Sequence, residues 1–314
     1  MKVCALAAVA AISAGVVPAD LNAQEEAGTL DIDGAEIFYR SLGSGPPVIV
    51  LHGGPSIGHG YLLSGLVPLA SDHRVIFFDQ RGIGLSTGAA DSTRLTVSRF
   101  LDDIEAVRSA LVGDEEPVHL VGHSWGAALA LSYAIDRPEF VRSLTLIDPT
   151  EPGNTFQSRQ EENLAAATTP ADSTELAALF GSDGYRFGDP VVVEEILHVI
   201  YRSWLGARDA ASRFVFGLDL EMAVRGRDVG ARVARASAGL ARWPDLERLG
   251  ARTLIVHGVL DPVPIEMARR LATEIDGSTL VELEGVGHFP MVEAPERLLE
   301  AIRDFLRGAM TDPG

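Results

Sequence analysis

A serine flanked by glycines is the sequence feature with the clearest chemistry. Residues 122–126 read Gly-His-Ser-Trp-Gly, after the apolar run 118–121 and before a stretch rich in Ala and Leu. A G-x-S-x-G pattern between a strand and a helix places its serine on a tight turn with the hydroxyl exposed. Because a serine hydroxyl is by itself a poor nucleophile, it requires a histidine base and an acid that orients the histidine. The pattern predicts Ser124 as the nucleophile of an acyl-transfer reaction.

The base and the acid are expected in loops that follow later strands. Of the eight histidines, His288 lies in a glycine-rich loop, 284–290, between the last predicted strand and the last predicted helix. Asp261 lies just beyond the next-to-last predicted strand. The resulting chain order Ser124, Asp261, His288 is the one expected where a G-x-S-x-G serine works with an acid and a histidine. Asp148, at the end of the strand that follows the Ser124 helix, is the alternative acid.

The tetrahedral intermediate of such a reaction needs hydrogen-bond donors for its oxyanion. The backbone N–H of Trp125, directly after the nucleophile, is the first expected donor. The second is expected in residues 52–55 (HGGP), where glycines let the backbone approach the substrate. Gly54 is the favoured donor there and Gly53 the alternative.

A second glycine-containing motif, residues 79–86 (DQRGIGLS), has the first half of a dinucleotide-binding loop. Thr87 occupies the third glycine position, so we expect no cofactor there. Asp79 and Arg81 are instead expected to pin a loop beside the active site. The chain contains neither a phosphate-binding P-loop nor an H-E-x-x-H zinc motif, so we expect neither a cofactor nor a metal.

The elements that must position these residues alternate between apolar strands and amphipathic helices. The middle strands are continuously apolar, as expected where both faces of a parallel sheet are buried. This alternation predicts an α/β fold with a mostly parallel sheet flanked by helices. The predicted strands are 36–40, 47–51, 74–79, 118–122, 144–148, 253–257 and 279–284, and the predicted helices are 97–112, 126–135, 194–204, 265–275 and 295–306.

One segment interrupts the alternation. Residues 149–245 begin with turn-forming residues (PTEPGN after Asp148) and contain helical patterns but no convincing βαβ unit. We expect 149–245 to form a helical cap over the carboxyl ends of the strands, where ligands of open α/β sheets bind. The core would then consist of 24–148 and 246–314.

The N-terminal residues are typical of a secretory signal peptide. Lys2 precedes an apolar run, 3–17, that is shorter than the roughly 20 residues needed to span a bilayer. We expect cleavage after Ala23, with Ala19 as the second candidate. A buried N-terminal helix and an uncleaved membrane anchor are the alternatives. The sequence thus predicts an exported enzyme, periplasmic or secreted, without stable membrane insertion once 1–23 are removed.

The charge and cysteine content exclude several classes of protein. Across 314 residues, 44 acidic side chains outnumber 26 Lys and Arg, for a formal net charge of −18. Such a surface repels phosphate backbones, so we expect no nucleic-acid partner. Cys4 is the single cysteine, which excludes a disulfide within the chain and a cysteine-based zinc site.

Together these motifs resemble the α/β-hydrolase fold family across nearly the whole chain after residue 23. Within it, the sequence most resembles the proline iminopeptidase group of serine peptidases. The resemblance implies a sheet core, a helical cap after Asp148, and release of an N-terminal proline or another residue from peptides. His123 departs from that group and is typical of lipases and esterases. The motifs that carry the resemblance are HGGP at 52–55, DQRGIGLS at 79–86, DIEAVR at 103–108, GHSWGAALALSYA at 122–134 and GVGHFPMVEAPERL at 285–298.

In the proline iminopeptidase group, carboxylates of the cap bind the free amino terminus of the substrate. Acidic residues of the predicted cap that could do so are Asp219, Glu221, Glu194 and Glu195, with solvated helix faces as their alternative role. The predicted function is therefore a secreted serine hydrolase, an aminopeptidase acting on a small molecule or short peptide. A carboxylesterase, a lactonase or a carbon–carbon bond hydrolase is the alternative, and a non-catalytic ligand receptor is a third hypothesis.

Overall fold

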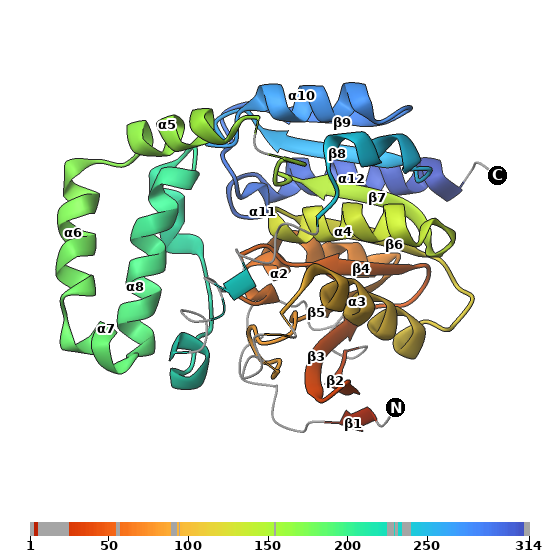
Figure 1. Ribbon diagram of the computed structural model, residues 1–314, viewed down its shortest axis with the longest axis horizontal. Helices are drawn as coiled ribbons and strands as arrows, with labels where there is room; N and C mark the ends of the chain where they lie inside the picture. The colour runs from red at the N-terminus through yellow and green to blue at the C-terminus, as the bar shows by residue number, and fades with distance from the viewer. Residues whose placement is uncertain are drawn as a thin grey trace.

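A twisted sheet with helices on both faces forms the centre of the protein (Figure 1). The computed structural model describes residues 3–5, 25–54, 57–88, 93, 95–153, 155–224, 229, 232–233 and 240–310. Within these residues the sheet has nine strands in the order β1-β2-β3-β5-β4-β6-β7-β8-β9. The strands are β1 (Val3–Ala5), β2 (Glu26–Ile32), β3 (Ala35–Leu42), β4 (Pro47–Leu51), β5 (Arg74–Phe78), β6 (Val118–His123), β7 (Val141–Ile147), β8 (Thr253–Gly258) and β9 (Thr279–Leu283).

The sheet changes character along its width. Strands β1, β2, β3 and β5 pair antiparallel, each with the next in that series. From β5 onward every pairing is parallel, through β4, β6, β7, β8 and β9. The carboxyl ends of the parallel strands therefore meet at one edge, and the loops that leave them lie close together.

Helices cover the two faces because the strands are apolar on both. In β4, Ile49 and Leu51 pack into the same cluster as residues of α3 (Val97–Leu111) and α4 (Trp125–Asp136). Val48 and Val50 face the opposite cluster, with residues of α2 (Leu63–Leu66) and α12 (Pro295–Met310). The helix α10 (Ile265–Glu274) adds Ala268 and Leu271 to the first cluster, and α11 (Pro290–Glu293) adds Met291 to the second.

The α/β prediction is confirmed, and each predicted strand overlaps an observed one. Strand β2, in contrast, was not predicted. Its sequence, EAGTLDI, has only a weak alternation interrupted by glycine, and it is held in place by a full antiparallel register with β3. A half-buried strand of this kind is stabilised by its neighbour more than by its own composition.

Between β7 and β8, the described residues form helices and no strand. The predicted cap, residues 149–245, includes α5 (Gln157–Ala167), α6 (Pro170–Phe180), α7 (Asp183–Phe187) and α8 (Pro190–Tyr201). Figure 1 shows these four helices gathered beside the sheet rather than on either of its faces. Short 3-10 turns follow at Arg202–Trp204 and Arg208–Arg213, and another, Trp243–Arg248, precedes β8.

Most of the predicted signal peptide, 1–23, lies outside the described residues. Of this segment the structure describes only β1, which pairs with β2 at the outer edge of the sheet. No helix among the described residues is long and apolar enough to cross a membrane.

Candidate active site

Ser124, His288 and Asp261 form one hydrogen-bonded chain. The Oγ of Ser124 lies 2.9 Å from Nε2 of His288, and Nδ1 of the same ring lies 2.7 Å from Oδ2 of Asp261. Ser124 lies between β6 and α4, while Asp261 and His288 lie in the loops after β8 and β9. The parallel sheet thus brings together three residues that are up to 164 positions apart in the chain.

The backbone at Ser124 has the geometry of a sharp strand-to-helix turn. Its φ of 53° and ψ of −119° lie in a region of backbone conformation that residues other than glycine rarely adopt. The flanking glycines make the turn possible. A Cβ on Gly122 would lie 2.6 Å from the Cα of Ala127, and one on Gly126 would overlap the carbonyl oxygens of Leu51 and His52. The G-x-S-x-G pattern is therefore a packing requirement of this turn.

The imidazole of His288 is held in its neutral form. It is almost fully buried, and burial lowers the pKa of its imidazole to about 3. The backbone N–H of His288 donates to the carbonyl oxygen of Trp204, 2.7 Å away, and the Trp204 ring packs against the imidazole with the ring centres 4.7 Å apart. A neutral imidazole that faces a serine hydroxyl can accept its proton.

The backbone N–H groups of Gly54 and Trp125, the two expected oxyanion donors, make no hydrogen bond with another described residue. The N–H of Gly53 is already occupied, because it donates to the Tyr61 hydroxyl at 2.7 Å. Of the two glycines considered from the sequence, Gly54 is therefore the one with a donor to offer. It has a φ of 102°, which is natural for glycine alone. Pro55 and Ser56 lie outside the described residues.

Gln80 links the segment that carries Gly54 to the start of the helix that begins at Trp125. Sequence reasoning missed this residue. Its backbone N–H donates to Nε2 of His52 at 3.0 Å, and its side-chain amide donates to the His52 carbonyl at 2.7 Å. The indole N–H of Trp125 donates to its amide oxygen at 3.0 Å. The only sequence signal was the position of Gln80 inside the 79–86 motif, between the two residues that were expected to pin a loop.

Tyr61 and His123 form a second connection that the sequence did not reveal. His123 donates from Nε2 to the carbonyl oxygen of His288, 2.8 Å away, which leaves Nδ1 to accept from the Tyr61 hydroxyl at 2.7 Å. That hydroxyl accepts from Gly53. Burial lowers the pKa of His123, so the ring is neutral and the donor direction of the whole relay is set. The relay joins the backbone at Gly53 to the backbone at His288.

Tyr61→Phe is expected to destabilise the fold and to slow catalysis. The change leaves Gly53 N–H without an acceptor and His123 Nδ1 without a donor, both in a buried site, and each such group costs about 1–3 kcal/mol. Urea denaturation should show a decrease in the free energy of unfolding of that order. Tyr201→Phe is the matched control, because no hydrogen bond of the Tyr201 hydroxyl to a described residue is present. Equal stability of Tyr61→Phe and wild type would contradict the relay.

Asp79 and Arg81 hold the loop after β5, as expected from the sequence. Asp79 accepts from the backbone N–H and the Nδ1 of His59, both at 2.8 Å, and from the backbone N–H of Leu85 at 2.9 Å. Although burial alone would raise it, His59 lowers the pKa of Asp79 below its usual range. Arg81 makes a buried ion pair with Asp103 on α3.

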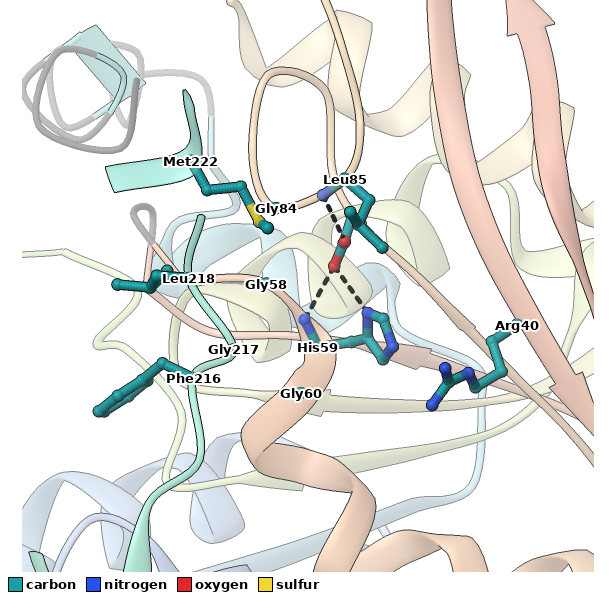
Figure 2. A pocket seen from close by; sticks show the side chains of 11 residues that line it. Arg40, Gly58, His59, Gly60, Gly84, Leu85, Phe216, Gly217, Leu218 and Met222 are labelled. Carbon is teal, nitrogen blue, oxygen red and sulfur yellow. Dashed lines mark hydrogen bonds and ion pairs between the residues drawn. The ribbon is translucent and has the colours of Figure 1, made fainter. Parts of the chain in front are cut away.

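A pocket lies beside these loops, and its empty space, including the part open to solvent, is about 490 Å³. Figure 2 shows Gly58–Gly60, Gly84 and Leu85 on one side and Phe216, Leu218 and Met222 of the cap segment on the other. Ser124, Asp261 and His288 do not line it. The apolar cap side chains thus face the loop that continues from Gly54.

Glu293, on α11, ties the His288 loop to the cap segment and was also missed. Its Oε1 accepts from the N–H of Gly287 at 2.9 Å, and its Oε2 accepts from the N–H of Ala207 at 3.0 Å. Burial raises the pKa of Glu293. The sequence signal was its place in the 285–298 motif.

The four cap acids singled out in the sequence are not brought to Ser124 by any described contact. Asp219 accepts from the N–H of Met222 at 2.8 Å, and Glu194 lies 3.5 Å from the N–H of Phe216. Glu195 and Glu221 are exposed. Asp148, the alternative acid, lies buried beside Asp261 but makes no hydrogen bond to His288 among the described residues.

The chain matches the model of the α/β hydrolase family over residues 48–301, and it belongs to that family. The protein is therefore a hydrolase of this fold. A proline iminopeptidase from Heyndrickxia coagulans is 29% identical over 295 residues, which cover 89% of this chain and 98% of the relative.

Solved structures agree on the fold. A meta-cleavage product hydrolase from Pseudomonas fluorescens is similar with a TM-score of 0.69 and 23% identity, covering 88% of this chain and 96% of that one. A thermophilic esterase from Thermogutta terrifontis has a TM-score of 0.66 and 24% identity, covering 90% and 97%.

Proposed function

We propose that the protein is an exported serine hydrolase that works through an acyl-enzyme, and that its substrates are peptides from which it releases an N-terminal proline or another residue. The single observation that carries the serine mechanism is the hydrogen-bonded chain from Ser124 through His288 to Asp261. The peptide substrate is supported by the similarity to a proline iminopeptidase over most of both chains.

The geometry supports a two-stage reaction. Ser124 Oγ attacks the substrate carbonyl carbon while its proton passes to His288 Nε2, and Asp261 stabilises the imidazolium through Nδ1–H. The N–H groups of Gly54 and Trp125 are the donors for the oxyanion. His288 then returns the proton to the departing amine, and a water molecule, deprotonated by the same imidazole, hydrolyses the acyl-enzyme.

An esterase, a lactonase or a carbon–carbon bond hydrolase is the second candidate. The observation that favours it is His123, which precedes the nucleophile as in lipases and esterases and is built into the relay from Gly53 to His288. The similarity to the solved structures of an esterase and a meta-cleavage product hydrolase also fits this candidate.

A substrate panel on residues 24–314 separates the two candidates. We expect hydrolysis of proline arylamide, with kcat/KM for it above that for the arylamide whose proline nitrogen is acetylated, because an aminopeptidase requires the free amine. Short acyl esters form the second arm of the panel. Turnover of esters alone would exclude the peptidase, and equal rates on the free and acetylated arylamides would exclude recognition of an amino terminus.

Export is proposed from the signal-like residues 1–23. Strand β1 pairs with β2 alone, at the sheet edge, so its removal would leave the other strand pairings in place. The test is the N-terminal sequence of protein recovered from the culture medium or the periplasm after expression of the full chain. A start at Gln24 or Asp20 supports processing, and an intact Met1 in the cell pellet contradicts it.

A further inference from the structure

Asp148 is a buried carboxyl group that the proposed mechanism does not use. It follows β7 directly, with a φ of 41°, and its side chain has no solvent exposure. Its Oδ1 accepts from the N–H of Gly258 at 2.8 Å, whereas its Oδ2 has no hydrogen-bond donor among the described residues. One oxygen of Asp148, one of Asp261 and one ring nitrogen of His257 all lie within 4.8 Å of one another.

Two adjacent carboxylates here would lack a compensating cation. Among the described residues no Lys or Arg forms an ion pair with Asp148 or Asp261. The titratable groups that face them are His257, His288 and Glu293, and Glu293 adds a negative charge rather than a positive one. Like charges at this distance cannot both remain ionised in a buried site without a large cost.

A metal ion is a poor alternative for balancing the charge, because both oxygens of Asp261 are already engaged. Oδ1 accepts from the N–H of Val263 at 2.8 Å and Oδ2 from His288. His257 is a poor source of positive charge: its Nδ1 lies 3.3 Å from Asp148 Oδ1, but burial lowers the pKa of this imidazole to about 4, so the ring is neutral at pH 7. The remaining way to neutralise the pair is a proton on one carboxyl.

We propose that Asp148 carries this proton at neutral pH and, as a neutral carboxylic acid, donates a hydrogen bond to Asp261. Asp261 keeps the negative charge because it accepts from Val263 and His288, whereas Asp148 has a single backbone donor. Asp148 is thus a positioning residue that acts through Asp261 on the orientation of His288. Its role in turnover rests on the proposed function, but the location of the proton does not.

The electrostatics of the two groups agree with this assignment. Burial raises the pKa of Asp148, and the neighbouring Asp261 raises it further. For Asp261, burial also raises the pKa, but the hydrogen bonds from Asp148 and Val263 lower it. Both directions are those of a pair that shares one proton, and the two partners of Asp261 against the single donor of Asp148 place that proton on Asp148.

The pH dependence of the free energy of unfolding tests whether Asp148 carries this proton in the native protein. If the native protein holds a proton on Asp148 that the unfolded chain releases above pH ~4, wild-type stability falls as pH rises, and Asp148→Asn lacks this term. The ratio of the unfolding equilibrium constants, wild type over D148N, should increase about tenfold per pH unit between pH 5 and 7. Urea denaturation at several pH values gives this ratio.

Asp172→Asn is the matched control for removing a buried carboxyl. Although burial would raise it, hydrogen bonds from Thr169 and Arg208 lower the pKa of Asp172, so this group is ionised in both states between pH 5 and 7. Its ratio should be independent of pH. A pH-independent D148N ratio would overturn the proposal, and a ratio that changes only above pH ~6.5 would overturn it by assigning the proton to His257.

Two further measurements test the proposal, and the first needs no variant. Infrared spectra of the wild-type protein at pH 7 should contain the carbonyl band of a protonated carboxylic acid, and its absence would overturn the proposal. In kinetics, Asp148→Ala should lower kcat by about 10-fold or more, and Asp148→Asn should recover most of that loss because an amide can still donate to Asp261. Equal losses in the two variants would contradict a hydrogen bond from Asp148 to Asp261.

Discussion

Ser124→Ala is expected to lower kcat/KM by about 10⁴-fold or more on any substrate that the protein hydrolyses. The reason is that the Ser124 Oγ lies 2.9 Å from Nε2 of the neutral His288, which can accept its proton. Without it, only the oxyanion donors and substrate binding remain to accelerate attack by water. The measurement is steady-state hydrolysis of the best substrate of the panel, together with labelling by an active-site serine probe.

Ser132→Ala is the matched control for this loss. Ser132 lies on the same helix, α4, and its buried hydroxyl donates to the Ala128 carbonyl and accepts from the N–H of Ala241. The variant should keep its activity and its labelling, because the hydroxyl faces neither His288 nor the donors. A Ser124→Ala variant that retains near-native turnover would refute the serine mechanism, and failure of the folded wild-type protein to label would favour the receptor hypothesis.

Asp103→Ala is expected to lower the free energy of unfolding by about 3–5 kcal/mol. Arg81 donates from Nε and Nη2 to the two oxygens of Asp103, at 2.9 and 2.5 Å, and both side chains are 1% exposed. Removing the carboxylate leaves a buried guanidinium whose described partner is the carbonyl oxygen of Ile32. Because Gln80 lies next to Arg81, we also expect weaker anchoring of His52 and Trp125. Urea denaturation measures the first effect.

Asp102→Ala, one residue earlier on α3, is the control for Asp103→Ala. Asp102 pairs with Arg137 at 2.6 Å, but that pair is partly exposed, so water compensates its loss. A second comparison is the double variant Arg81→Met with Asp103→Leu, which removes both charges and should be more stable than Asp103→Ala alone. If Asp102→Ala and Asp103→Ala were equally destabilising, the burial of the Arg81–Asp103 ion pair would make no difference to the cost of breaking it.

Much of the fold and the core of the candidate site could be predicted because their signals are local. Continuous apolar runs such as 47–51 and 118–122 mark strands that are buried on both faces, and the structure places strands at both positions. The turn at Ser124 is encoded by its two neighbouring glycines, since a Cβ at either would clash. His288 was distinguished from seven other histidines by its loop between a strand and a helix.

Other parts of the site depend on contacts between distant segments, for which one sequence carries no local signal. Tyr61 meets His123 across 62 positions, and Gln80 meets Trp125 across 45. Strand β2 went unpredicted for the same reason, because its partner β3 supplies what its own composition lacks.

The sequence by itself determined the class of the protein and the candidate nucleophile, since both follow from residue types at short, fixed spacing. It left open which of two aspartates faces the histidine and which of two glycines offers a donor. Only the tertiary structure decided these points: Asp261 contacts His288 while Asp148 lies behind it, and the hydroxyl of Tyr61 occupies the N–H of Gly53. The physical reason is that the two aspartates carry the same carboxyl group and the two glycines the same N–H group. Only the packing of the folded chain decides where each of these groups points.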